Sequence, residues 1–207
     1  MKPTAHLHES VLALQGLMHQ LDHIEAIGRV IAERLDIGAR LLAVGNGGSA
    51  AEAQHLTAEL VGRYQHERRP LSALALHAES SSLTAIVNDY GPDEMFARQV
   101  RAHGRPGDVL VAFSTSGRSD NVIEAVCRAH ECGLFTLACT GPVPNPLAQT
   151  ADDVIAVDVP WAPVVQEAHL VILHLLCEAI DAVMCRDAEA AVAGTHDGDS
   201  VRERRLV

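Results

Sequence analysis

Five short apolar runs alternate with segments of helical spacing, and this alternation constrains the fold more than any other feature. Apolar residues fill the runs almost continuously, which is typical of strands buried on both faces. Helical patterns follow the first run as far as Arg63 and the third as far as Cys132. The sequence therefore predicts an α/β protein with a five-stranded parallel sheet covered on both faces. The runs are 40–44, 72–76, 108–113, 134–139 and 153–158.

The two ends of the chain differ in apolar content. Apolar residues recur at three- and four-residue steps over the first 36 residues, which predicts an N-terminal helix over 5–36. A last helix is expected from about Val164 to Met184. The segment 187–207 has few large apolar residues and is expected to be a disordered tail. We therefore predict one domain over 1–186.

Composition limits the partners and the compartment. Sixteen Lys and Arg against 27 Asp and Glu give a net charge of −11, and only six residues are Phe, Trp or Tyr. A nucleic-acid partner is not expected, although a small basic patch such as Arg68–Arg69 remains open. No apolar stretch approaches the 18 or so residues of a membrane span, and the N-terminus lacks a signal core. Five cysteines without a CxxC pair suit reduced thiols in the cytoplasm.

The first glycine-rich loop, Gly45-Asn-Gly-Gly-Ser49, follows the first predicted strand. Its glycines allow close approach of the backbone to a ligand, and the helix start behind it offers free amides for an anion. Ser49 with Glu52 fits a capping box. The alternative is a tight turn without a ligand. The loop matches neither a dinucleotide nor a Walker motif.

The second loop, Ser114-Thr-Ser-Gly-Arg-Ser119, has four hydroxyls in six residues between a strand and a helix. Uncharged hydroxyls and backbone amides suit phosphate monoesters and sugars. The alternative is a loop that satisfies its hydroxyls by local turn bonds. Both loops are predicted at the carboxyl edge of the sheet, where parallel sheets bind ligands.

His55 and Glu59 lie four residues apart, on one face of the helix after the first loop. An imidazole and a carboxylate at that spacing can bind one metal or share a proton transfer, and the alternative is an ordinary surface pair. His174 stands in the apolar stretch Leu170–Cys177. It is either a hydrogen-bonded core residue or a base whose pKa is tuned by burial.

Gln166 and His174 are eight residues apart, about 12 Å along a helix. Both could reach one metal only if Gln166 lay at the frayed start of the helix, or if the two came from different subunits. Asn88 and Asp89 follow the apolar run Leu83–Val87. They are expected to form either a cap or a ligand-binding loop.

Four segments together resemble a known family, the phosphoheptose isomerases of the sugar-isomerase (SIS) domain proteins. The segments are Gly45–Tyr64, Val87–Tyr90, Ser114–Gly117 and Gln166–His169 with His174. The resemblance extends over about residues 8–185. It implies a three-layer α/β/α fold with a flavodoxin-like sheet and a homotetramer whose active sites lie between subunits.

The resemblance also implies an activity: conversion of sedoheptulose 7-phosphate into D-glycero-heptose 7-phosphate through an enediol, the first step of nucleotide-activated heptose biosynthesis. It implies one zinc ion per subunit, held by His55, Glu59, Gln166 and His174. Glu59 and His174 would be the acid–base pair, and Arg63 would reach a neighbouring subunit's site. The substrate-binding residues would be Asn46, Gly47, Gly48, Ser49, Glu59, Arg63, Asn88, Asp89, Ser114, Thr115, Ser116, Ser119 and Gln166.

The chain departs from the family where Val164-Val-Gln-Glu167 replaces the common Arg-Ile-Gln-Glu, and where Pro142–Pro146 replaces a glycine-rich stretch. Three alternatives stay open. The chain could be a non-catalytic SIS protein that binds a replication initiator, although such proteins less often retain both Glu59 and His174. It could be a phosphosugar-sensing module, for which a DNA-binding domain is missing. It could also isomerise another ketose phosphate.

Overall fold

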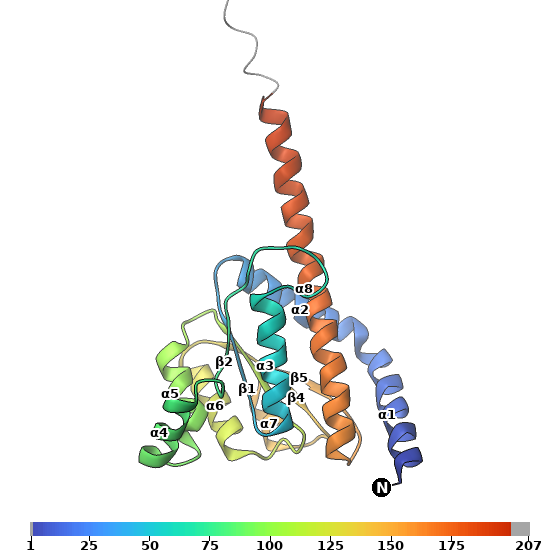
Figure 1. The fold of residues 1–207 in the computed structure, drawn as a ribbon, viewed down its shortest axis with the longest axis vertical. Coiled ribbons are helices and arrows are strands. Elements are labelled where there is room, and N and C mark those ends of the chain that lie inside the picture. Colours follow the sequence, from blue (N-terminus) through green and yellow to red (C-terminus); the bar gives the residue numbers. More distant parts are fainter. Residues whose placement is uncertain (1, 200–207) are drawn as a thin grey trace, which may run out of the picture.

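The structure is a computed structural model that describes the backbone of residues 2–199 and the side chains of residues 2–185. Five parallel strands form one sheet in the order β2-β1-β3-β4-β5 (Figure 1). This is the flavodoxin-like order of doubly wound α/β folds. It confirms the predicted fold class. The strands are β1 (Leu41–Gly45), β2 (Ala73–Ala75), β3 (Val109–Ser114), β4 (Phe135–Thr140) and β5 (Asp153–Ala156).

Side chains alternate between the two faces of the sheet and fill two separate cores. In β1, Leu41 and Ala43 belong to one core, and Leu42 and Val44 belong to the other. The first core is covered by α1 (Pro3–Leu17), α2 (Leu21–Asp36), α3 (Gly48–Val61) and α8 (Ala162–Asp199). The second is covered mainly by α5 (Glu94–His103), α6 (Asp120–Glu131) and α7 (Pro146–Thr150). Both β1 and β3 are buried at every position.

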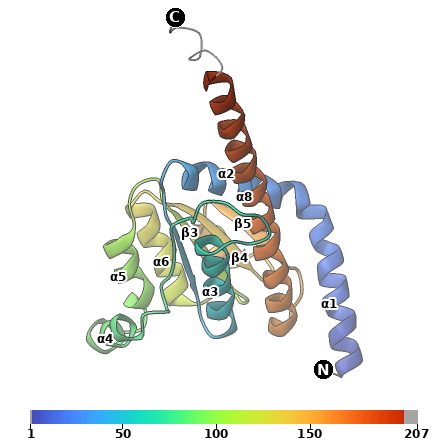
Figure 2. The ribbon, with the colours of Figure 1, turned by 45° about the horizontal axis from the view of Figure 1, so that its top comes forward.

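The N-terminal segment is two helices rather than the single predicted helix over 5–36. A 3-10 turn, η1 (Met18–Gln20), separates α1 from α2. Figure 2 shows the resulting change of direction, with α2 crossing the sheet layer and α1 descending beside α8. The turn lets both helices pack against α8, which a straight helix could not do.

Helix α8 is longer than the predicted 164–184, because it begins at Ala162 and continues to Asp199. The extension includes part of the segment 187–207 that was expected to be disordered, and alanine, which has the highest helix propensity, is frequent there. Residues 200–207 lie outside the described part of the chain. The division into a domain over 1–186 and a tail stays a prediction.

Two further expectations need correction. Asn88 and Asp89, expected in a cap or a ligand-binding loop, lie instead with the run Leu83–Val87 inside one helix, α4 (Ser80–Tyr90), whose start is capped by the Glu79 carboxylate. The segment Ala162–Cys185 is long enough for a membrane span and contains an 18-residue window with a mean hydropathy of 1.8. Half of that window is buried inside the domain, where the helix packs against α1, α2 and α3. It therefore serves as the core helix of this fold.

Candidate functional site

The first glycine-rich loop turns directly from β1 into α3. Gly47 adopts a positive φ of 57° and precedes the helix as its N-cap. A side chain at Gly48 would overlap with the Gln166 carboxamide, so glycine is needed there for Gln166 to lie against the loop. The predicted capping box is wrong. Ser49 and Glu52 are both buried inside α3, and Glu52 points toward α8 instead of back toward the cap.

Two hydroxyls of the second loop, those of Ser114 and Ser119, lie close together, whereas Ser116 is exposed. The Ser114 hydroxyl accepts a hydrogen bond from the Gly117 amide at 3.2 Å and lies 3.3 Å from the Ser119 hydroxyl. Ser119 is the N-cap residue of α6 but makes no side-chain cap bond. Its hydroxyl and the first amides of a twelve-residue helix therefore face the same end. This arrangement suits a phosphate group.

A residue that the sequence analysis missed links the two loops. The carboxamides of Asn46 and Asn121 exchange two hydrogen bonds, at 2.9 and 3.0 Å. Asn121 lies in the first turn of α6, directly after the second loop. No local pattern marks this residue, because its partner is 75 positions away along the chain. The pair couples the two predicted substrate loops.

Helices α3 and α8 lie side by side and run in the same direction (Figure 1). Successive residues of α3 contact successive residues of α8 along their length. Gly48 meets Gln166, Glu52 lies 3.5 Å from His169, and His55 lies 3.4 Å from His174. The sequence alone could not pair these positions, since they are more than a hundred residues apart. The pairing brings both histidine-bearing faces together.

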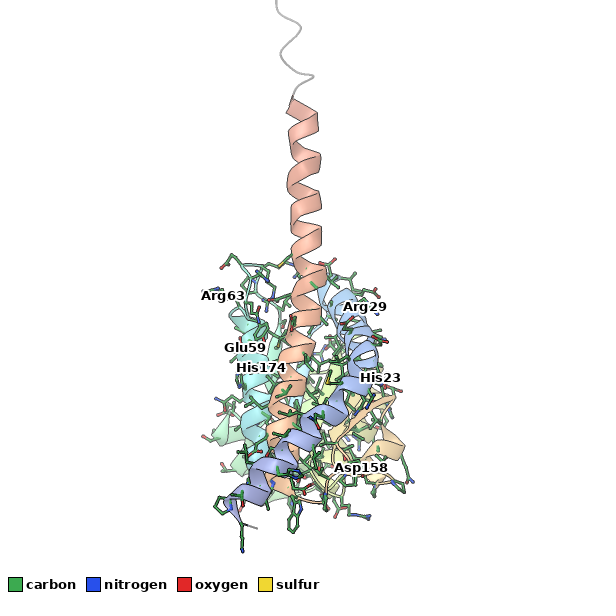
Figure 3. All side chains as sticks on the ribbon, turned by 90° about the vertical axis from the view of Figure 1, so that its right-hand side faces the viewer. His23, Arg29, Glu59, Arg63, Asp158 and His174 are labelled. Carbon is green, nitrogen blue, oxygen red and sulfur yellow. The ribbon has the colours of Figure 1, made fainter. Side chains whose placement is uncertain are left out.

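Three of the predicted chemical residues meet between these helices. The Nε2 atom of His55 lies 3.0 Å from Oε1 of Glu59 and 3.4 Å from Nε2 of His174. Figure 3 shows Glu59 and His174 adjacent, with Arg63 beyond them at the end of α3. His174 is therefore not a satisfied core histidine. Among the described side chains of this helix, the fully buried histidine is His169, whose ring contacts Phe113.

The environment of His174 favours its neutral form. Partial burial lowers the pKa of His174, and the nearby His55 lowers that pKa further, while the Glu59 carboxylate opposes the shift. The Tyr64 ring stacks on the His174 ring with centroids 5.5 Å apart. A neutral imidazole beside a carboxylate can exchange protons or bind a metal.

The donor set fits a metal ion of the zinc type. One ligand atom each from His55, Glu59 and His174 lies within 4.8 Å of the other two. Imidazole nitrogens with one carboxylate are the ligands of many catalytic zinc sites. Gln166 does not join this cluster within one chain. It lies inside α8 rather than at a frayed start, about 12 Å along the helix from His174.

The remaining predicted residues are Arg63, at the opposite end of α3 from the carboxyl edge, and Asn88 and Asp89. Arg63 is exposed, in the loop after α3. Asn88 and Asp89 are hydrogen-bonded to each other at 2.8 Å near the end of α4. Figure 1 places α4 on the opposite side of the domain from α8. Asn88 and Asp89 are therefore not brought to the His55–Glu59–His174 cluster within one chain.

Among the cysteines, burial raises the pKa of Cys139 and raises that of Cys177 to about 12. Both are therefore neutral thiols at physiological pH.

Comparison with known proteins first defines the class. A family profile described as the SIS domain matches residues 7–141. The match covers β1, β3 and both glycine- or serine-rich loops, and the fold has the doubly wound sheet whose carboxyl edge presents them. The class is thus that of the SIS-domain proteins.

More similar relatives narrow the class. The phosphoheptose isomerase of Streptomyces coelicolor is 52% identical over 188 residues, which cover 91% of this chain and 81% of the relative. The phosphoheptose isomerase structure from Neisseria gonorrhoeae is 42% identical with a TM-score of 0.80, covering 86% of this chain and 96% of its own. The structure from Francisella tularensis is 33% identical with a TM-score of 0.82 and the same coverage. This chain belongs to the phosphoheptose isomerase family.

Proposed function

We propose that this protein isomerises sedoheptulose 7-phosphate to D-glycero-heptose 7-phosphate in heptose biosynthesis. The observation that supports this most is the cluster of His55, Glu59 and His174 between α3 and α8, in a chain of the phosphoheptose isomerase family. An aldose–ketose isomerase needs a base at the carbon proton, an acid at the carbonyl oxygen and a phosphate grip. The cluster supplies the first two, and the loop Ser114–Ser119 supplies the third.

The proton transfers follow from the two groups. The Glu59 carboxylate takes a proton from C1 of the open-chain ketose. The released electron pair forms the enediol double bond while the C2 oxygen receives a proton from His174. The reverse transfers, from the C1 oxygen to His174 and from Glu59 to C2, then yield the aldose. Acid–base assistance of this kind contributes about 10²–10⁴-fold.

His55, Glu59 and His174, with Gln166 of a second copy, would hold a zinc ion. When bound, the ion would supply Lewis-acid polarisation of the sugar carbonyl. Treatment with a chelator, followed by dialysis, tests this requirement. Activity that falls on chelation and returns with added zinc supports the assignment. Full activity with less than a tenth of an equivalent of metal would refute it.

The substrate contacts require a second copy of the chain. Asn46, Ser49 and the loop Ser114–Ser119 lie at the carboxyl edge, whereas Arg63 points outward. In a homotetramer Arg63 and Gln166 would complete a neighbouring site. An exposed apolar stripe along α1 and the start of η1 supports such an assembly, with Leu7, Val11, Leu14 and Met18 all on the surface. Light scattering that reports a stable monomer at micromolar concentration would refute it.

Turnover by the purified protein tests the function. We expect aldose 7-phosphate formation from sedoheptulose 7-phosphate, measured by NMR, and slower reaction with five- and six-carbon ketose phosphates. A faster reaction with one of these would select the alternative of an isomerase for another sugar. The replication-initiator alternative is not favoured, and turnover would exclude it as the sole function. We also propose a cytoplasmic location, where the sugar phosphate would be available.

A further inference from the structure

Arg68 is a buried cation rather than part of a surface basic patch. It lies in the loop between α3 and β2, and only 1% of its side chain is exposed. Its Nε donates a hydrogen bond to Oδ1 of Asp181 at 2.8 Å. Asp181 belongs to α8, and 3% of its side chain is exposed. The ion pair thus joins the loop after α3 to the core helix.

The rest of the Arg68 guanidinium closes the end of α3. One terminal nitrogen donates to the carbonyl oxygen of Glu59 at 2.8 Å, and the other donates to that of Leu60 at 3.0 Å. The last carbonyls of a helix have no partner within the helix. Arg68 therefore acts as the cap of α3, and one of its bonds is to the backbone of Glu59 itself. The planar guanidinium holds its N–H donors at fixed angles to one another, so it can bond Asp181 and the two carbonyls at once, whereas a lysine ammonium could not.

Asp181 also shapes the loop. Its second oxygen lies 3.4 Å from the backbone nitrogens of Gln65 and His66, which donate to it. The same loop presents Arg63, the residue predicted to reach a neighbouring site. Asp181 is seven residues beyond His174, about 10 Å along α8. The ion pair thus connects the backbone of Glu59, through Arg68, to the helix that bears both Asp181 and His174.

We propose that Arg68 and Asp181 are a positioning pair for the isomerase site. They anchor the α3 end that bears Glu59 against α8, and so set the spacing of the Glu59 carboxylate from His174 on the facing helix. This inference rests on the proposed roles of Glu59 and His174. Displacement of a catalytic group by about 1 Å can cost about 10²-fold in rate, so the anchor controls chemistry without touching substrate.

A positioning role makes a different prediction from a purely structural one. Well-packed apolar residues often replace a buried ion pair without loss of stability. The double variant Arg68→Met/Asp181→Leu removes both charges together. If the pair has only a structural role, a double variant that folds should have the same kcat and metal affinity as wild type. A positioning role predicts that function stays impaired, because the carbonyl bonds to α3 are gone.

The experiment compares wild type, Arg68→Lys and the double variant. We measure melting temperature, kcat and KM for sedoheptulose 7-phosphate, and the affinity of the metal-free protein for Co²⁺ by visible absorption. For a double variant that melts within a few degrees of wild type, we expect kcat to fall by about 10-fold or more and KM to change less than about threefold. Co²⁺ affinity should fall by about 10-fold. Arg68→Lys, which keeps the buried charge, carries the test where the double variant does not fold.

Two controls make the result specific. Asp36→Asn breaks the neighbouring exposed ion pair with Arg69 and should leave kcat and Co²⁺ affinity unchanged. In a Glu59→Gln background, Arg68→Lys should lower kcat no further, because it acts through Glu59. If the double variant folds and its kcat and Co²⁺ affinity stay within twofold of wild type, the positioning role of Arg68 and Asp181 is refuted, but the role of Glu59 is not. A Glu59→Gln variant with wild-type kcat overturns the role of Glu59 and this inference with it.

Discussion

The α3–α8 helix pair and the loop Ser114–Ser119 are built on opposite principles. The helix pair brings three titratable side chains within 4.8 Å, from positions up to 119 residues apart. The loop gathers uncharged hydroxyls and amides from six consecutive residues. One region can move protons, and the other can only hold a group in place. The two tasks of a sugar-phosphate isomerase are therefore separable by mutation.

The largest expected effect is on the helix pair. Glu59→Gln keeps the shape of the side chain and removes its basicity, and His174→Gln removes the imidazole. Each should lower kcat by about 10²-fold or more, with a much smaller change in KM, because the phosphate grip lies elsewhere. Steady-state kinetics with sedoheptulose 7-phosphate measures both constants. Either variant with near wild-type kcat would show that its residue has no catalytic role.

The loop should give the converse result. Ser116→Ala and Ser119→Ala each remove a hydroxyl available to the phosphate, and hydrogen bonds to charged groups contribute about 1.5–3 kcal/mol. We expect KM to rise by about 10-fold and kcat to change by less than about threefold. Inhibition by inorganic phosphate should weaken in parallel. Unchanged KM in both variants would place the phosphate at another part of the edge.

A smaller effect should come from the contact between the first loop and α8. In Gly48→Ala the nearest atoms to the new methyl group are those at the end of the Gln166 side chain, which can turn away. The protein should stay about as stable as wild type, because the flexible end of Gln166 can move without displacing the backbone. KM should rise several-fold as Gln166 moves.

Gly45→Ala is the matched control for that substitution. Its methyl group would overlap with the backbone of Ser49, which cannot turn away. We expect a loss of about 1–3 kcal/mol in the free energy of unfolding, measured by urea denaturation. Equal stability losses in the two variants would show that Gln166 is as fixed as the backbone.

The two regions also differ in how far the sequence predicts them. The loop is local, so its hydroxyl spacing and its place after a buried strand were readable directly. The fold could be predicted because its strands are also local features: a short, continuously apolar run such as 108–113 indicates a buried strand without information from the rest of the chain. Helix α4 was missed, since its serine-rich start and short apolar run lack a clear helical period.

The helix pair depends on long-range packing. The spacing of His55 and Glu59 was readable, but their meeting with His174 follows from the parallel alignment of α3 with α8. The burial of Arg68 depends on Asp181, 113 residues away. Likewise Glu52 suits a capping box by spacing, whereas contact with His169 and the core draws it inward. A sequence pattern predicts that such charged residues lie on the surface, because charged groups are rarely buried without a partner and the partner is distant in the sequence.

The smallest expected effect is a pH dependence confined to the helix pair. Burial and the neighbouring His55 lower the pKa of His174 below its ordinary value of 6.5, whereas the unfolded chain retains that ordinary value. As the pH falls below 6.5, the unfolded chain therefore takes up a proton on His174 before the folded chain does. The stability that His174 contributes as a neutral group is complete above pH 6.5 and is lost as the pH falls from 6.5 through the lower pKa of the folded state. Melting curves of metal-free protein between pH 8 and 5.5 should show a larger loss for wild type than for His174→Gln. Ser119→Ala should follow wild type, because the loop hydroxyls do not titrate in this range. A parallel loss in wild type and His174→Gln would mean that His174 titrates as an ordinary exposed imidazole.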